Sequence, residues 1–256
     1  MKSLEILVST VETLRSPNGC EWDKKQTFDS LKTCIIEEAY ELVDAIESND
    51  KNKLIEELGD YLLQVIMICT IASETGIFNL DIVALNVNKK MIDRHPHVFK
   101  DTQHLNEKQV IDQWEKIKET EHKKKSVMED IPTMPSLLKA EKIQKRASRV
   151  GFDWPNVSDT IDKLEEEISE FKNALASNCQ EQIEEEAGDI LFSLVNVLRK
   201  CNLNSEDVLR RANKKFISRF SEMEKLSNYT LDKLTLESKE QLWQKAKEQQ
   251  AANKLR

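Results

Sequence analysis

The chain has 256 residues, of which only 5 are glycine and 5 are proline, whereas 33% are charged. Tight turns, glycine-rich phosphate loops and many-stranded sheets use glycine and proline, so a β-sandwich, a P-loop enzyme and a Rossmann domain are all disfavoured. The formal net charge of -8 provides no surplus of cations for a phosphate backbone, so we expect no nucleic-acid partner.

Amphipathic periodicity predicts helices along almost the whole chain. They are expected over residues 3–14, 30–48, 51–75, 79–94, 107–124, 136–148, 158–177, 180–201, 205–226 and 237–253. Asp29 or Ser30 should cap the second helix, and Ser158 or Asp159 the seventh. Two prolines and a basic run near residues 123–135 indicate a linker. We therefore predict an all-α fold with one unit at 1–124, a linker at 125–135 and a second unit at 136–256.

Cysteine usage and hydropathy indicate a cytoplasmic protein without a membrane partner. The five cysteines are scattered and form no C-x-x-C motif, so we expect neither a disulfide framework nor a zinc site. The amphipathic N-terminus carries Glu5, unlike a signal peptide. The longest apolar stretch, residues 61–72, is shorter than the roughly 18 residues that indicate a membrane span.

An internal repeat is the most informative feature of the sequence. Acidic segments at 36–41 and 55–60 recur at 165–170 and 184–189, so that the two copies are offset by 129 positions. Trp114 recurs as Trp243 with the same offset, and Gly19 and Trp22 resemble Gly151 and Trp154 at an offset of 132. Several anchors in one order indicate two copies of one helical unit.

Each copy places two acidic pairs on a predicted helical hairpin. Residues three apart share one face of a helix, and a turn near residues 48–50 brings the two pairs to the same height. Carboxylates this close repel one another unless they point to water or bind a cation. Flanking apolar residues favour a partly buried cation site, which suits Mg²⁺, inside a four-helix bundle made with a second hairpin. The acids are Glu38, Glu41, Glu57 and Asp60 in the first unit and Glu167, Glu170, Glu186 and Asp189 in the second.

Basic and aromatic residues complete a predicted site for a nucleoside triphosphate. Lys215 and Arg219 lie four apart on one predicted helix, as do Trp243 and Lys247 on another. Lys163 precedes the acids of the second unit by one helical turn. Lysine and arginine hold phosphates, and tryptophan stacks on a base.

At these residues the sequence resembles MazG, a family of nucleoside triphosphate pyrophosphohydrolases in the all-α NTP pyrophosphatase group, over nearly the whole chain. The resemblance implies Mg²⁺-dependent cleavage of NTPs and dNTPs to NMP and pyrophosphate, with broad base specificity and a role in nucleotide-pool control; Mn²⁺ is an alternative ion. It also implies a homodimer in which each unit completes a four-helix bundle with its partner. The matching segments are Gly19-Cys20-Glu21-Trp22-Asp23, the acidic elements of both units, Arg94-His95-Pro96-His97-Val98-Phe99, Lys142-Ile143-Gln144-Lys145-Arg146 and Val150-Gly151-Phe152-Asp153-Trp154.

The resemblance assigns roles to residues of the second unit. The mechanism that it implies is attack of a metal-activated water on a phosphorus, with Glu166 as one candidate general base. The implied metal ligands are Glu167, Glu170, Glu186 and Asp189. The implied phosphate and base contacts are Lys163, Lys215, Arg219, Trp243 and Lys247.

The two units differ at one position of the predicted site. Cys34 stands in the first unit where the second has Lys163, so we expect the first unit to hold metal but to grip triphosphate less well. The alternative function is a non-catalytic helical dimerisation or adaptor protein that retains a vestigial acidic cluster. That alternative predicts no pyrophosphate release from any nucleotide.

Overall fold

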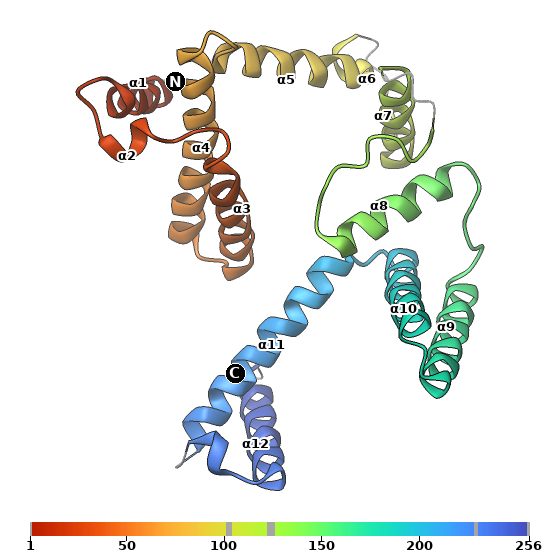
Figure 1. The fold of residues 1–256 in the computed structure, drawn as a ribbon. Coiled ribbons are helices and arrows are strands. Elements are labelled where there is room, and N and C mark those ends of the chain that lie inside the picture. The colour runs from red at the N-terminus through yellow and green to blue at the C-terminus, as the bar shows by residue number, and fades with distance from the viewer. Residues whose placement is uncertain (1, 101–103, 122–125, 228–229, 255–256) are drawn as a thin grey trace. The chain divides into compact units, whose positions relative to one another are not determined.

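The computed structural model describes residues 2–100, 104–121, 126–227 and 230–254 (Figure 1). These residues form α-helices and one short 3-10 helix and contain no strand, which confirms the predicted all-α class. Backbone contacts divide the chain into two compact units, Met1–Lys123 and Lys124–Arg256. No helix among the described residues is long and apolar enough to cross a membrane.

The first unit is built on a helical hairpin. Helix α1 (Lys2–Arg15) and the single turn α2 (Glu21–Lys24) precede the hairpin of α3 (Leu31–Ser48) and α4 (Lys51–Glu74). Asn49 makes the turn with a left-handed φ of 56°, and the Asp50 side chain caps α4 by accepting from the backbone N–H of Asn52. Helix α1 packs on α4. The buried core of this unit joins α1, α3 and α4 and consists of Val11, Leu31, Ile66, Met67 and Ile71.

Three further helices complete the first unit. They are α5 (Leu80–Arg94), the single turn α6 (Pro96–Phe99) and α7 (Glu107–Glu121). Asn79 caps α5 by accepting from the backbone N–H of Ile82 at 3.0 Å. Residues 122–124 of the predicted fifth helix lie outside the described residues.

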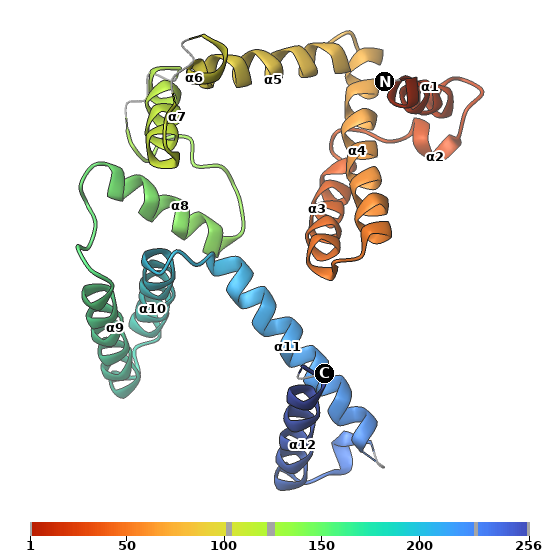
Figure 2. The same cartoon turned by 180° about the vertical axis from the view of Figure 1, so that it is seen from behind.

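The second unit repeats the hairpin. Helix α8 (Ser136–Arg149) packs on α10 (Gln180–Lys200), which pairs with α9 (Val157–Ser177) across a left-handed turn at Asn178. Helix α11 (Ser205–Leu226) follows, then the 3-10 turn η1 (Leu231–Lys233) and α12 (Leu236–Lys254), which folds back on α11 (Figure 2).

Two predicted helix starts differ from the structure in detail. Helix α9 begins at Val157, so its cap is Asn156 rather than Ser158 or Asp159. The Asp159 carboxylate accepts a hydrogen bond from the Asn156 backbone N–H at 3.0 Å, which fixes the first turn from inside the helix. Ser30 does precede α3, but its side chain makes no capping hydrogen bond.

A buried arginine holds the segment that precedes α8. The Arg146 guanidinium, in a residue only 9% exposed, donates to the backbone carbonyl oxygens of Val127 at 3.1 Å, Asp130 at 3.3 Å and Glu129. Asp130 has a left-handed φ of 57°, so the chain curls around the guanidinium. Residues 126–130 are therefore packed against α8 and belong to the second unit.

Candidate active site

The hairpin of the second unit brings three carboxylates together. Oxygen atoms of Glu167 on α9 and of Glu186 and Asp189 on α10 lie within 4.8 Å of one another. Glu167 is only 6% exposed, while Glu186 is half-buried and Asp189 is exposed. Glu170, the fourth predicted ligand, lies outside this group. The cluster thus opens from a buried end toward solvent.

Electrostatic repulsion makes this cluster suitable for a cation. Burial raises the pKa of Glu186, and the charges of Glu170 and Glu167 raise it further. A carboxylate that is difficult to ionise beside other carboxylates is stabilised in its charged form when a dication binds. The donor set consists of carboxylate oxygens alone, which hard ions such as Mg²⁺ prefer. The residues present therefore fit a magnesium ion.

Lys163 lies at the edge of the second carboxylate cluster. Its Nζ is 2.9 Å from Glu167 Oε1 and 3.0 Å from Glu166 Oε1. Hydrogen bonds to Glu167 and Glu166 raise the pKa of Lys163 well above its ordinary value, so the ammonium is charged at neutral pH. The structure thus brings the predicted phosphate contact and the candidate base together, as an ion pair.

The first unit has a similar cluster without the lysine. Oxygen atoms of Glu38, Glu41 and Glu57 lie within 4.8 Å of one another, whereas Asp60 lies outside the group. Burial raises the pKa of Glu38 and of Glu57, and neighbouring acids add to both effects. Cys34, which is half-buried, brings no positive charge. The first cluster therefore has less compensation than the second.

The predicted phosphate and base contacts other than Lys163 lie together on a separate arm formed by α11 and α12. The Arg219 Cζ atom lies over the Trp243 ring, 5.9 Å from its centroid. The Arg219 Nε donates a hydrogen bond to Gln250 Oε1 at 3.2 Å. Lys215 and Lys247 are exposed one turn away on the same two helices. Both views show α11 extending from the α9–α10 hairpin and carrying α12 along it (Figures 1 and 2). Within one chain, this arm and the carboxylate cluster are apart.

The arginine–tryptophan pair recurs in the first unit, where Lys90 and Arg94 repeat the spacing of Lys215 and Arg219. Arg94 is buried and stacks over Trp114 at 5.3 Å, and the His95 ring meets the same indole edge-on at 4.9 Å. Residues 88–94 and 213–219 share the pattern Asn-Lys-Lys-x-Ile-x-Arg, with an offset of 125 rather than 129. The basic pairs of the two units therefore correspond at an offset four residues shorter than that of the acidic segments.

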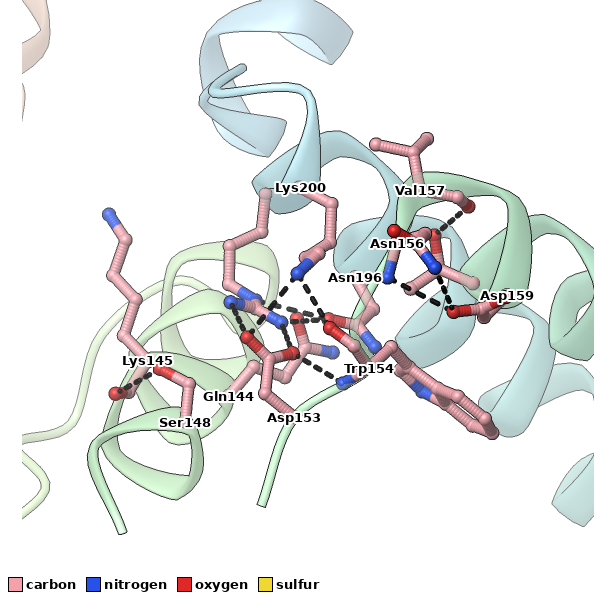
Figure 3. Close-up of polar contacts among 12 residues, drawn as sticks. Gln144, Lys145, Ser148, Asp153, Trp154, Asn156, Val157, Asp159, Asn196 and Lys200 are labelled. Atoms are coloured by element: carbon pink, nitrogen blue, oxygen red, sulfur yellow. Dashed lines mark hydrogen bonds and ion pairs between the residues drawn. The ribbon is translucent and has the colours of Figure 1, made fainter. Parts of the chain in front are cut away.

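A cluster of charged residues beside the second hairpin, formed by Asp153, Arg199 and Lys200, was not predicted (Figure 3). The Asp153 carboxylate accepts two hydrogen bonds from Arg199, one of them at 3.2 Å, and lies 3.6 Å from Lys200 Nζ. Hydrogen bonding to Arg199 lowers the pKa of Asp153 below its ordinary value. Lys200 also donates to the Trp154 carbonyl oxygen at 2.7 Å. These contacts tie the loop before α9 to the end of α10.

Comparison with known proteins agrees with this architecture. The MazG nucleotide pyrophosphohydrolase domain matches the chain twice, over residues 26–99 and 156–223. A nucleoside triphosphate pyrophosphohydrolase/pyrophosphatase MazG of Thermotoga maritima is 46% identical over 249 residues, which cover 95% of each chain. A nucleoside triphosphate pyrophosphohydrolase of Escherichia coli is 39% identical over 98% of this chain and 99% of its own. The uncharacterized protein YabN of Bacillus subtilis is 45% identical over 94% of this chain and 50% of its own.

Proposed function

The chain belongs to the MazG nucleotide pyrophosphohydrolase family, and from this premise we propose that it hydrolyses nucleoside triphosphates to NMP and pyrophosphate in a Mg²⁺-dependent reaction. Its substrates are both NTPs and dNTPs, with broad base specificity, and its role is the control of nucleotide pools. The observation that carries the proposal is the cluster of Glu167, Glu186 and Asp189, which fits a hard dication beside a lysine.

The proposed ion site of the second unit includes one acid outside the compact cluster. Glu167, Glu186 and Asp189 would hold the ion, with Glu170 as the fourth ligand. When bound, Mg²⁺ supplies positive charge that offsets the phosphate charges and polarises a water molecule. Mn²⁺ would substitute, because it accepts the same oxygen ligands. We assign the same role in the first unit to Glu38, Glu41, Glu57 and Asp60.

The chain's own groups bind phosphate and move a proton. Lys163 offers its ammonium to the triphosphate, since it stands one turn from Glu167 along α9. As the ammonium turns toward phosphate, it leaves the Glu166 carboxylate, 3.0 Å away in the present ion pair, free to accept a proton. Glu166 is therefore our candidate general base.

A second copy of the chain would bring the basic arm to the carboxylates. Because α11 and α12 carry Lys215, Arg219, Trp243 and Lys247 away from their own hairpin, we assign these contacts to the hairpin of a partner subunit. Phosphates would meet the three cations, and the base would stack on the indole. The site is complete only in the homodimer.

The outer faces of the hairpins support this homodimer. Ile55, Leu58 and Leu62 form an exposed apolar stripe on α4, with Gly59 among them, and α10 exposes Leu191 beside Gly188. A mid-helix glycine costs about 1 kcal/mol relative to alanine. Beyond the adjoining residues and backbone of its own helix, a Cβ at either glycine would meet no described atom of the same chain within 4 Å. Both glycines would allow a helix of the partner subunit to approach closely, and the two hairpins would then complete a four-helix bundle.

Product analysis tests the proposal. The purified chain should release pyrophosphate from the eight common NTPs and dNTPs with Mg²⁺ or Mn²⁺ and lose activity in excess chelator. Ion-exchange chromatography should show NMP, whereas NDP with orthophosphate would indicate another phosphohydrolase. A matched sample carrying Glu186→Gln with Asp189→Asn sets the background. Absence of pyrophosphate from every nucleotide would favour the dimerisation or adaptor function.

A further inference from the structure

The two units differ in the packing between the hairpin and the helix before it. In the first unit Leu31 and Met67 belong to the buried apolar core. The offset of 129 residues places Thr160 at the position of Leu31 and Asn196 at the position of Met67. The core residue Ile71 likewise becomes Lys200. The first unit shows that these three positions can be apolar, so the polar residues of the second unit are not required there by the fold.

Gln144 on α8 has an unsatisfied acceptor in this packing. The residue is 6% exposed, and its Nε2 donates to the backbone carbonyl oxygen of Phe192 on α10 at 2.8 Å. Among the residues that the structure describes, its Oε1 is the one buried side-chain oxygen without a hydrogen-bond partner. Burying an acceptor without a donor is unfavourable. A donor from outside the chain would satisfy it.

Asn196 lies one turn beyond Phe192 on α10, and its amide is fixed in orientation. Its Oδ1 accepts hydrogen bonds from Arg199 Nε at 3.0 Å and Nη2 at 2.6 Å. Arg199 is held in turn by Asp153. Figure 3 draws the polar contacts around the labelled Asp153 and Asn196. Because Arg199 occupies the oxygen, the amide has its Nδ2 hydrogens to offer. The contact between α8 and α10 near Phe192 therefore has an acceptor without a partner on α8 and an amide donor on α10.

These amides lie at the right distance from the carboxylates for a nucleoside. Asn196 follows Asp189 by seven residues on the same face of α10, which is about 10 Å along the helix. A triphosphate held at the carboxylates would extend its nucleoside over a similar length. The loop before α9 reaches the same end of the hairpin, where Lys200 holds the backbone of Trp154. The hairpin thus has the carboxylates that would bind the metal ion and phosphates at one height, and the amide of Asn196 two helical turns away.

We propose that Gln144 and Asn196 form a nucleoside subsite of the second unit, an inference that rests on the proposed pyrophosphohydrolase function. Gln144 Oε1 accepts a hydrogen bond from a donor on the nucleoside, either an N–H of the base or a ribose hydroxyl. Asn196 Nδ2 donates to an acceptor on the same nucleoside. A base stacked on Trp243 of the partner subunit would keep its edge available for both amides. The first unit has Met67 at the position of Asn196 and therefore lacks the donor of this subsite.

Kinetics with Gln144→Leu test the subsite. The KM for GTP should rise about fivefold or more, since one hydrogen bond is lost. The inhibition constant of tripolyphosphate, which has no nucleoside, should stay within about twofold. If the donor is the exocyclic amino group, the variant should lose the wild-type preference for GTP over ITP. If the donor is the 2′-hydroxyl, it should lose the preference for GTP over dGTP.

Stability measurements and two further variants complete the test. Gln144→Leu removes the unsatisfied acceptor, so its Tm should be no lower than that of the wild-type chain. Asn196→Met, which introduces the residue of the first unit, should also raise KM without affecting tripolyphosphate. As a control, Gln180→Leu replaces an exposed glutamine at the start of α10 and should leave KM unchanged. In an active enzyme, an unchanged KM in both subsite variants, or an equal change for GTP and tripolyphosphate, overturns the subsite alone. A wild-type chain that releases no pyrophosphate overturns both proposals.

Discussion

Exchanging one residue between the two copies tests the energetic basis of their difference. Met67→Asn places in the first unit the residue that the second unit has at Asn196. Met67 is 5% exposed within the apolar core, so losing its burial should cost about 1.5–3 kcal/mol. The new amide would find Thr70 where the second unit has Arg199, and an unpartnered buried amide costs about 1–3 kcal/mol more. Together the two contributions give an expected loss of about 2.5–6 kcal/mol.

Urea unfolding followed by circular dichroism at 222 nm measures this loss. With an m-value of about 2 kcal/mol/M, the midpoint of the first unit should fall by about 2 M. The reciprocal Asn196→Met should move the midpoint by less than about 0.5 M, because the methionine fills an interior position and Arg199 keeps Asp153. A loss below about 1 kcal/mol in Met67→Asn would refute the burial costs assigned to this position. An equal loss in Asn196→Met would refute the reasoning that the polar packing is not required by the fold.

Four further outcomes are expected from the carboxylates and glycines. Glu186→Gln should abolish pyrophosphate release. Its Tm without Mg²⁺ should be no lower than that of the wild-type chain, because the substitution relieves repulsion between the carboxylates. An unchanged kcat would show that Glu186 is not part of the active site. Glu57→Gln with Asp60→Asn should cost less than half of kcat, whereas Glu186→Gln with Asp189→Asn should cost nearly all of it, and the reverse result would contradict our ranking of the units. The raised pKa of Glu57 and of Glu186 means that the folded chain holds these protons more tightly than the unfolded chain. Without dications, Tm should therefore rise as the pH falls from 7 toward the ordinary pKa of 4.5. The rise in Tm should be smaller in Glu186→Gln. A fall in Tm over this pH range would contradict the prediction. Gly188→Ala should shift the chain toward monomer in light scattering, and an unaltered dimer would separate the glycine from the interface.

Local chemistry made the helices predictable. The periodicity of apolar residues predicts helices at 51–75 and 180–201, and the structure has them at Lys51–Glu74 and Gln180–Lys200. Turn residues fixed the hairpins, since Asn49 and Asn178 each adopt the left-handed conformation that asparagine tolerates. The cap of α9 was misjudged because Asn156, Ser158 and Asp159 are all good capping residues, and sequence alone does not rank them.

Tertiary placement was less accessible from sequence. Helical spacing put four acids at one height in each hairpin, but the structure groups only three, because side-chain direction and burial decide which oxygens meet. The position of α12, which carries Trp243, relative to the α9–α10 hairpin depends on the path of α11, which no periodicity encodes. Asn196 lies in a stretch that reads as an ordinary helix face. Its interest emerged only when the structure placed it one turn from the carbonyl that Gln144 contacts.

The contact between Arg146 and residues 126–130 determines where the second unit could be isolated as an autonomous fragment. A fragment that begins at α8 keeps the arginine but loses the carbonyl oxygens of Val127, Glu129 and Asp130. A buried guanidinium without acceptors is strongly unfavourable, so α8 would have to move to expose it. The smallest self-sufficient second unit therefore starts near Ser126, ten residues before its first helix. A recombination or gene-fusion event with its boundary at the start of α8 would therefore separate Arg146 from the carbonyl oxygens that it binds.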